Sequence, residues 1–201
     1  MKVTIFTPVY NRANLMEKLK NSLINQTVKD FEWLIIDDGS SDNINEVVKE
    51  FQSQVKEFNI VFISKKNGGK HTCINIATEI AKGELFFIVD SDDYLSNDAI
   101  EKVIDMYASI EDKSKFCGVA GLRVHKNGKL IGTTFDGNYI DGTSLERAKY
   151  KITGDKSEVF FTDILKRYKF PEFAGEKFIT ENVVWLKMAS DGYLIRWFNA
   201  P

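Results

Sequence analysis

The sequence predicts an α/β fold with a mostly parallel central sheet. Between residues 3 and 104, short apolar runs rich in β-branched and aromatic residues alternate with longer stretches whose apolar residues recur at helical spacing. This alternation is typical of βαβ units. With 201 residues, 43% of them hydrophobic and 28% charged, the composition is that of a globular protein. We therefore expect a single domain over residues 1–201.

Four strands and four helices are expected in the first half of the chain. The strands are expected at residues 3–7, 33–37, 60–64 and 85–89. Apolar residues at helical spacing place helices between them, at residues 15–24, 47–55 and 73–81. A fourth helix is expected at residues 98–107, where Ser96 and Asn97 provide capping side chains.

The pattern changes after residue 115. Apolar runs at residues 118–124 and 130–135 flank a turn sequence containing Gly128, which predicts a β-hairpin. Residues 136–158 are rich in Gly, Asp, Lys and Thr, and we expect a partly ordered loop there.

Two short helices and one strand are expected after this loop. The helices are expected at residues 162–168 and 181–189, and the strand at residues 193–198. Because the sequence stops directly after that strand-like run, we expect that a C-terminal segment is missing.

Charge and hydropathy exclude several classes of protein. The net charge of −2 gives no general attraction to nucleic acid or to anionic lipid. The longest apolar run, residues 85–89, is far shorter than the ~20 residues of a membrane span, and no secretion signal is present. We expect a cytoplasmic protein, compatible with peripheral contact at the inner membrane face. Cys73 and Cys117 lack metal-ligand spacing and are expected to be core thiols, with a disulfide as the alternative.

Three carboxylates follow the strand expected at residues 85–89. Asp90, Asp92 and Asp93 repel one another, but the arrangement becomes favourable when Mg²⁺ or Mn²⁺ binds one or two of them together with phosphate oxygens. Open α/β sheets also bind ligands at the carboxyl ends of their strands. The alternative, capping of the next helix, requires one carboxylate and does not explain Asp90.

Two other strand ends carry polar groups. Asp37 and Asp38 follow the second strand, where a carboxylate can accept a hydrogen bond from a nucleobase N–H group, although capping by the residues after them is also expected. The first strand is followed by Tyr10, whose ring offers a face for stacking. Parallel strands would bring all three ends to one edge of the sheet.

A glycine-rich turn, residues 67–69, precedes Lys70 and a predicted helix. Free N–H groups at the helix start and the lysine suit a phosphate group. Neither the dinucleotide-binding nor the P-loop spacing occurs in the chain. The two histidines, His71 and His125, lack a metal-binding pattern and are expected to be ordinary surface or core residues.

Taken together, five motifs resemble those of the family 2 glycosyltransferases of the GT-A fold. They are Thr-Pro-Val-Tyr-Asn-Arg at 7–12, Asp-Asp-Gly-Ser-Ser-Asp at 37–42, Asn-Gly-Gly-Lys at 67–70, Lys-Gly-Glu at 82–84 and Asp-Ser-Asp-Asp at 90–93. The resemblance implies a nucleotide-binding half, residues 1–115, and an acceptor-side half, residues 116–201. It also implies an inverting enzyme of cell-surface polysaccharide or glycan synthesis. Its donor would be a nucleotide-diphosphate sugar, with UDP as the usual nucleotide. Its cofactor would be Mn²⁺ or Mg²⁺, and its acceptor would be a glycan or a lipid-linked molecule.

The resemblance also assigns residue roles. It implies that Asp38 holds the nucleobase, that Asp90 approaches the ribose and that Asp92 binds the metal. Further nucleotide-binding residues are expected at Thr7, Pro8, Tyr10 and Lys70.

The general base is the least direct assignment. In the family an acidic pair precedes a helix, and its Asp is the base; counting back from Trp185 and Lys187 puts that position at Glu181, where the pair is Thr-Glu. Glu176 is a second candidate. A glutamate in the first turn of a helix also interacts favourably with the helix dipole, which is the structural alternative for Glu181.

Two other functions are alternatives to sugar transfer. Because the acidic pair is altered, a domain that binds nucleotide sugar without turnover is the main alternative, and a sugar hydrolysis assay with and without Mn²⁺ separates the two. A phosphatase with an aspartate nucleophile would carry its motif on the first strand, whereas Asp90 follows the fourth.

Overall fold

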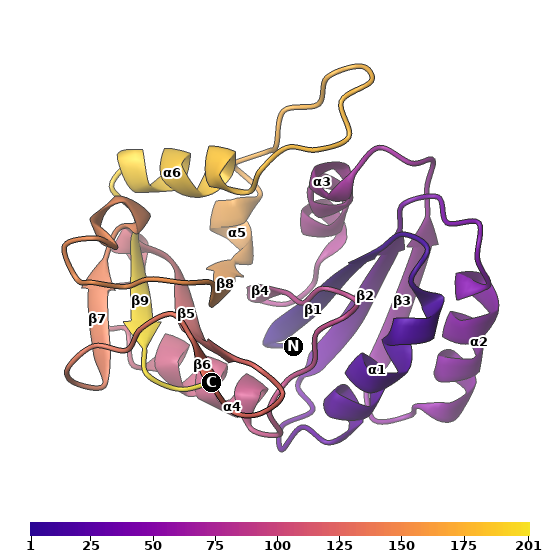
Figure 1. Cartoon of the computed structure of the whole chain (residues 1–201), viewed down its shortest axis with the longest axis horizontal. Helices are drawn as coiled ribbons and strands as arrows, with labels where there is room; N and C mark the ends of the chain where they lie inside the picture. The colour runs from indigo at the N-terminus through magenta and orange to yellow at the C-terminus, as the bar shows by residue number, and fades with distance from the viewer.

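The structure is a computed structural model that describes residues 1–201. Its centre is a nine-stranded sheet in the order β3-β2-β1-β4-β8-β5-β9-β7, with β6 paired to β5 (Figure 1). The first four strands are β1 (Val3–Val9), β2 (Phe31–Asp37), β3 (Asn59–Ser64) and β4 (Leu85–Ile88). The helices that connect or follow them are α1 (Met16–Ile24), α2 (Ile44–Gln54), α3 (Lys70–Ile80) and α4 (Ala99–Ala108). The α/β prediction with a mostly parallel central sheet is confirmed.

The parallel part of the sheet is centred on β1. Val3 lies opposite Phe31 of β2 on one side and opposite Leu85 of β4 on the other. Every residue of β2 is buried, as expected for a strand that is covered on both faces. All four predicted strands and all four predicted helices of this half are present, with bounds that shift by a few residues.

The strand order reverses direction at β1. The chain passes from β1 to β2 and β3 on one side, then returns to place β4 on the other side of β1. Because crossovers between parallel strands are right-handed, α1 and α2 cover one face and α3 the opposite face, as Figure 1 shows. Ligands bind open α/β sheets at such a reversal, outside the carboxyl ends of the strands.

The second half of the chain extends the same sheet. β8 (Lys156–Phe161) lies antiparallel between β4 and β5 (Phe116–Val124), and β9 (Leu194–Phe198) lies parallel to β5. β7 (Tyr139–Gly142) pairs with β9 at the edge. The expected loop at residues 136–158 is therefore wrong in part, because it contains β7 and the first half of β8. Pairing of β7 with β9, and of residues 156–158 with β5, outweighs the polar composition of that segment.

The remaining elements are short. The hairpin is confirmed, although its second strand, β6 (Leu130–Ile131), is shorter than predicted. The helices are α5 (Thr162–Leu165) and α6 (Asn182–Ser190). Single 3₁₀ turns occur at Ala13–Leu15, Lys113–Lys115 and Ser144–Glu146.

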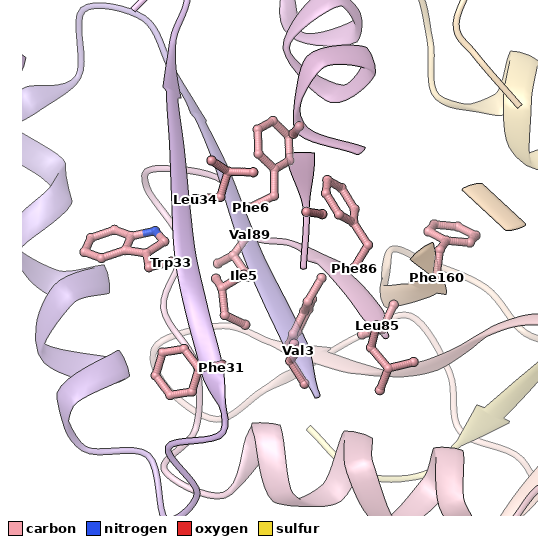
Figure 2. Packing of buried hydrophobic residues seen from close by; sticks show 14 of the residues in the cluster. Val3, Ile5, Phe6, Phe31, Trp33, Leu34, Leu85, Phe86, Val89 and Phe160 are labelled. Atoms are coloured by element: carbon pink, nitrogen blue, oxygen red, sulfur yellow. The ribbon is translucent and has the colours of Figure 1, made fainter. Parts of the chain in front are cut away.

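The core contains 46 buried apolar residues from both halves of the chain. Figure 2 shows Phe6 of β1 beside Phe86 of β4, with ring centroids 5.3 Å apart, and Phe160 of β8 beyond them. Both cysteines are free and buried, as predicted, and burial raises the pKa of each thiol to about 12. None of the helices combines the length and the apolar character needed to cross a bilayer.

Candidate active site

Three polar strand ends meet at one edge of the sheet, as the sequence predicts. Val9 at the end of β1 lies opposite Asp37 at the end of β2, and Phe6 lies opposite Ile88 at the end of β4. The segments that follow, residues 10–12, 38–42 and 90–93, therefore leave the sheet together at the reversal of strand order.

The loops after β1 and β2 are bound to each other. The backbone N–H of Asn11 donates to Ser40 Oγ, and Asn11 Oδ1 accepts from the backbone N–H of Ser41, both at 2.8 Å. Asn11 has φ of 52°, a left-handed conformation that asparagine tolerates better than most residues. Ala13 N–H donates to Asp42 Oδ2 at 2.9 Å. The two loops thus form one rigid platform beside Tyr10, which is half exposed.

The carboxylate of Asp38 accepts hydrogen bonds from the glycine-rich turn and from Lys65, which precedes it. Its Oδ1 accepts from Lys65 Nζ at 2.6 Å and from Gly68 N–H at 2.8 Å. Its Oδ2 accepts from Gly69 N–H at 2.7 Å and from Asn67 Nδ2 at 3.1 Å. A carboxylate has about four acceptor positions, so those of Asp38 are filled. The buried carboxylate therefore fixes the turn that begins α3.

We expect Asp38→Ala to lower the free energy of unfolding by about 3–5 kcal/mol, because Lys65 and two backbone N–H groups would lose a buried anionic partner. Urea unfolding checks this against Asp30→Ala, which removes an exposed carboxylate. The turn that precedes Lys70 would also lose its support. Unchanged stability would contradict this structural role of Asp38.

Lys70 joins two carboxylates from distant segments. At the start of α3, its Nζ lies 2.7 Å from Asp90 Oδ1 and 2.9 Å from Glu181 Oε1. Burial lowers the pKa of Lys70, but the two carboxylates outweigh it, and the pKa lies above its usual value. Likewise, burial raises the pKa of Glu181, but Lys70 outweighs it, and that carboxyl titrates below its usual range. Glu181 is therefore an ionised carboxylate at neutral pH.

The two candidate bases lie in different surroundings. Glu181 is the N-cap residue of α6 but makes no side-chain capping bond, so its carboxylate is free to bind Lys70. The exposed Glu176 instead accepts from Phe178 N–H within its own turn at 2.8 Å. Gly69 brings the two segments together, because a Cβ there would lie 2.0 Å from the carbonyl oxygen of Lys177. The geometry favours Glu181.

The other carboxylates after β4 also face cations. Asp92 Oδ2 lies 2.8 Å from Arg12 Nη1, and Asp93 pairs with Arg123 of β5. Burial raises the pKa of Asp93, against the opposing effect of Arg123. No group of three or more His, Cys, Asp or Glu side chains converges on one point. Asp92 is half exposed, so it is the carboxylate most open to a cation from solvent.

A cavity of about 760 Å³ opens beside this cluster. Lys70, Asp90, Asp92 and Glu181 all line it, so four of the predicted site residues come together. The other four, Thr7, Pro8, Tyr10 and Asp38, lie outside its lining. Thr7 is fully buried, and its Oγ1 accepts from Trp33 Nε1 at 3.0 Å, so its side chain belongs to the core.

Three cations of the site were not predicted as such. Arg12 ends the first motif, and Lys65 precedes the glycine-rich turn, so both had a sequence signal by position. Arg123 interrupts the apolar run of β5, and this is only a weak sequence signal for a site residue. The partners of all three carboxylate contacts lie on other segments, which the local sequence does not reveal.

The chain resembles known proteins in sequence and in structure. Residues 4–162 match the profile of glycosyl transferase family 2. The chain is 37% identical over 135 residues to a chondroitin synthase of Pasteurella multocida. The matched residues make up 67% of this chain and 14% of that protein. TarS 1–349 of S. aureus in complex with UDP-GlcNAc superimposes with a TM-score of 0.72 at 22% identity, over 100% of this chain and 59% of that one. A mannosyltransferase of Pyrobaculum calidifontis in complex with GDP-Man and Mn²⁺ superimposes with a TM-score of 0.70 at 21% sequence identity. The superposition covers 100% of this chain and 55% of that one.

Proposed function

The chain belongs to glycosyl transferase family 2, and from this premise we propose that it transfers a sugar from a UDP-sugar to an acceptor hydroxyl with inversion at the anomeric carbon. The contact of Lys70 with both Asp90 and Glu181 carries the proposal, because it joins the donor-binding motif to a carboxylate base across one cavity. The acceptor is proposed to be a glycan or a lipid-linked saccharide of the cell surface, in line with the chondroitin synthase relative.

The donor is proposed to lie across the three strand ends. The platform formed by the loops after β1 and β2 would take the nucleoside, with the half-exposed Tyr10 ring available for stacking. Lys70 and the N-terminus of α3 would face the diphosphate, since helix N-termini and cations both favour anions. UDP is preferred over GDP because the TarS complex holds UDP-GlcNAc, although the mannosyltransferase complex holds GDP-Man.

The transfer step is a direct displacement. The acceptor oxygen attacks the anomeric carbon and forms the new glycosidic bond. The bond from that carbon to the diphosphate oxygen breaks, and its electron pair leaves with the diphosphate. Glu181 accepts the proton of the acceptor hydroxyl as general base, for which an ionised carboxylate on the cavity wall is suited.

The residues after β4 fit a divalent cation of the hard, oxygen-binding type. Mg²⁺ and Mn²⁺ are held by one or two carboxylates together with substrate phosphates, so a three-residue cluster is not required. We assign Asp92 as the residue that would hold the ion, because it is the half-exposed carboxylate on the cavity wall. When bound, such an ion stabilises negative charge on a departing diphosphate.

We expect Asp92→Ala to lose the part of UDP affinity that Mn²⁺ adds, about tenfold or more, because the ion would lose its protein ligand. Titration calorimetry with Mn²⁺ and with chelator measures this part directly. Asp105→Ala on the exposed face of α4 is the matched control. Equal UDP affinity in the variant, in wild type and in chelator would remove Asp92 from the metal site.

Nucleotide binding and donor hydrolysis together test the proposed function. Thermal shifts with UDP, GDP and CDP in the presence of Mn²⁺ should show stabilisation by UDP above the others. Slow hydrolysis of a UDP-sugar should accompany it. Binding without any turnover, even with acceptor present, would support the non-catalytic alternative, and no stabilisation by any nucleotide would reject both.

A further inference from the structure

The cavity extends past Glu181 to two ionisable side chains of β8 that the proposed mechanism does not use, Lys156 and Glu158. β8 runs antiparallel to β4, with Phe160 opposite Phe86. The start of β8 therefore lies at the same end of the sheet as the carboxyl end of β4 and Asp90. Lys156 and Glu158 are two residues apart on a strand, so their side chains leave the same face.

Lys156 is a buried cation with unused hydrogen-bond donors. The residue is 4% exposed, and its ammonium donates to the carbonyl oxygen of Thr133 at 3.0 Å. It forms no ion pair, whereas buried charges in proteins are normally paired. An ammonium has three donors, so two remain without a protein partner. Burial lowers the pKa of Lys156 and Arg147 lowers it further, against the opposing effects of Glu158 and Asp155.

The neighbouring charges compensate Lys156 only in part: Asp155 also lines the cavity, but it is exposed and forms no ion pair with Lys156. Arg147 lies over the Trp197 ring at 5.3 Å, donates to the carbonyl oxygen of Gly154 and also lacks a carboxylate partner. Arg123 is already paired with Asp93. Burial raises the pKa of Glu158 to about 7, so this carboxyl is only partly ionised at neutral pH. Lys156 and Arg147 therefore stand on one wall of the cavity as two cations without an ion-pair partner.

We propose that Lys156, supported by Arg147, forms a subsite for an acidic group, a carboxylate or a phosphate, carried by one of the two sugar substrates. The inference rests on the proposed function, because it requires a substrate in this cavity. An anionic oxygen accepts hydrogen bonds from the free donors of Lys156 and also offsets its unpaired charge. A neutral hydroxyl accepts a hydrogen bond but does not offset the charge. The acidic group belongs either to the donor sugar, as in a uronic acid, or to the acceptor.

Two binding arms distinguish the two sources. In the donor arm, the affinities of UDP-glucuronic acid and UDP-glucose are compared by calorimetry with Mn²⁺. In the acceptor arm, glucuronate and glycerol phosphate are compared with glucose on protein saturated with UDP. We expect the acidic probe to bind roughly tenfold or more tightly in one arm, the gain typical of a hydrogen bond to a charged group.

Lys156→Met should abolish that preference, because methionine keeps the apolar stem and removes the charge. Lys129→Met, on an exposed turn outside the cavity, should retain it. Lys156→Arg should restore most of it. If Lys156→Met fails to fold, Arg147→Met replaces it and should reduce the preference.

Two failures are distinguishable. Acidic and neutral probes of equal affinity in both arms, or a preference that survives Lys156→Met, would overturn the subsite while UDP binding still supports the proposed function. Absence of UDP binding to the wild-type protein would overturn the proposed function itself, and the subsite with it.

Discussion

Replacing Glu181 with glutamine is expected to lower sugar transfer by at least about 10²-fold while UDP affinity and thermal stability change little. Glutamine keeps the shape of the side chain and can still accept a hydrogen bond from Lys70, but it cannot take the acceptor proton. A base acts on the transition state, so the loss should appear in kcat rather than in donor binding. Initial rates of transfer, measured with an acceptor at saturating UDP-sugar, check this expectation.

Glu176→Gln is the matched control for Glu181→Gln. Glu176 is exposed and bound within its own turn, so its variant should keep nearly full transfer activity. Glu181→Asp tests reach, because the shorter carboxylate would lie farther from Lys70 and from the cavity. If Glu176→Gln loses transfer activity and Glu181→Gln keeps it, the general base is Glu176 and the assignment to Glu181 is wrong. Donor hydrolysis must be followed separately, since water can attack without the base.

The first half of the chain, residues 1–115, could be predicted from the sequence because its signals are local. Each apolar strand ends in polar residues, and parallel pairing then brings Asp38, Asp90 and Tyr10 to one edge. One of the five motifs has a structural reason instead of a chemical one. Gly83 of the Lys-Gly-Glu motif packs against β1, where a Cβ would lie 2.3 Å from the backbone nitrogen of Thr4.

The second half, residues 116–201, could not be predicted equally well because its secondary structure depends on tertiary pairing. Lys156, Ser157 and Glu158 have the composition of a loop, yet they form half of a central strand whose partners come from distant segments. The contacts of the site have the same character. Nothing local to Lys70 indicates that it reaches Glu181, and nothing local to Asp38 indicates that its carboxylate is filled by the turn at residues 65–69.

Lys70→Met is expected to weaken UDP-sugar binding by roughly 10–100-fold, because the diphosphate would lose a charge-assisted contact at the start of α3. It should also leave Asp90 and Glu181 facing each other across the cavity without their shared cation. Lys66→Met, on the same loop but outside the cavity lining, provides the control. UDP affinity by calorimetry gives the first readout.

The pH profile of Lys70→Met separates positioning of the base from simple loss of phosphate binding. In the wild-type protein Lys70 holds the pKa of Glu181 below its usual range, against the effect of burial, so Glu181 stays ionised into mildly acidic conditions. Without the lysine, burial is left unopposed and the pKa of Glu181 rises. The acidic limb of kcat/KM, which reports the free enzyme, should therefore move to higher pH. If UDP affinity falls and the limb stays in place, Lys70 binds phosphate without tuning the base.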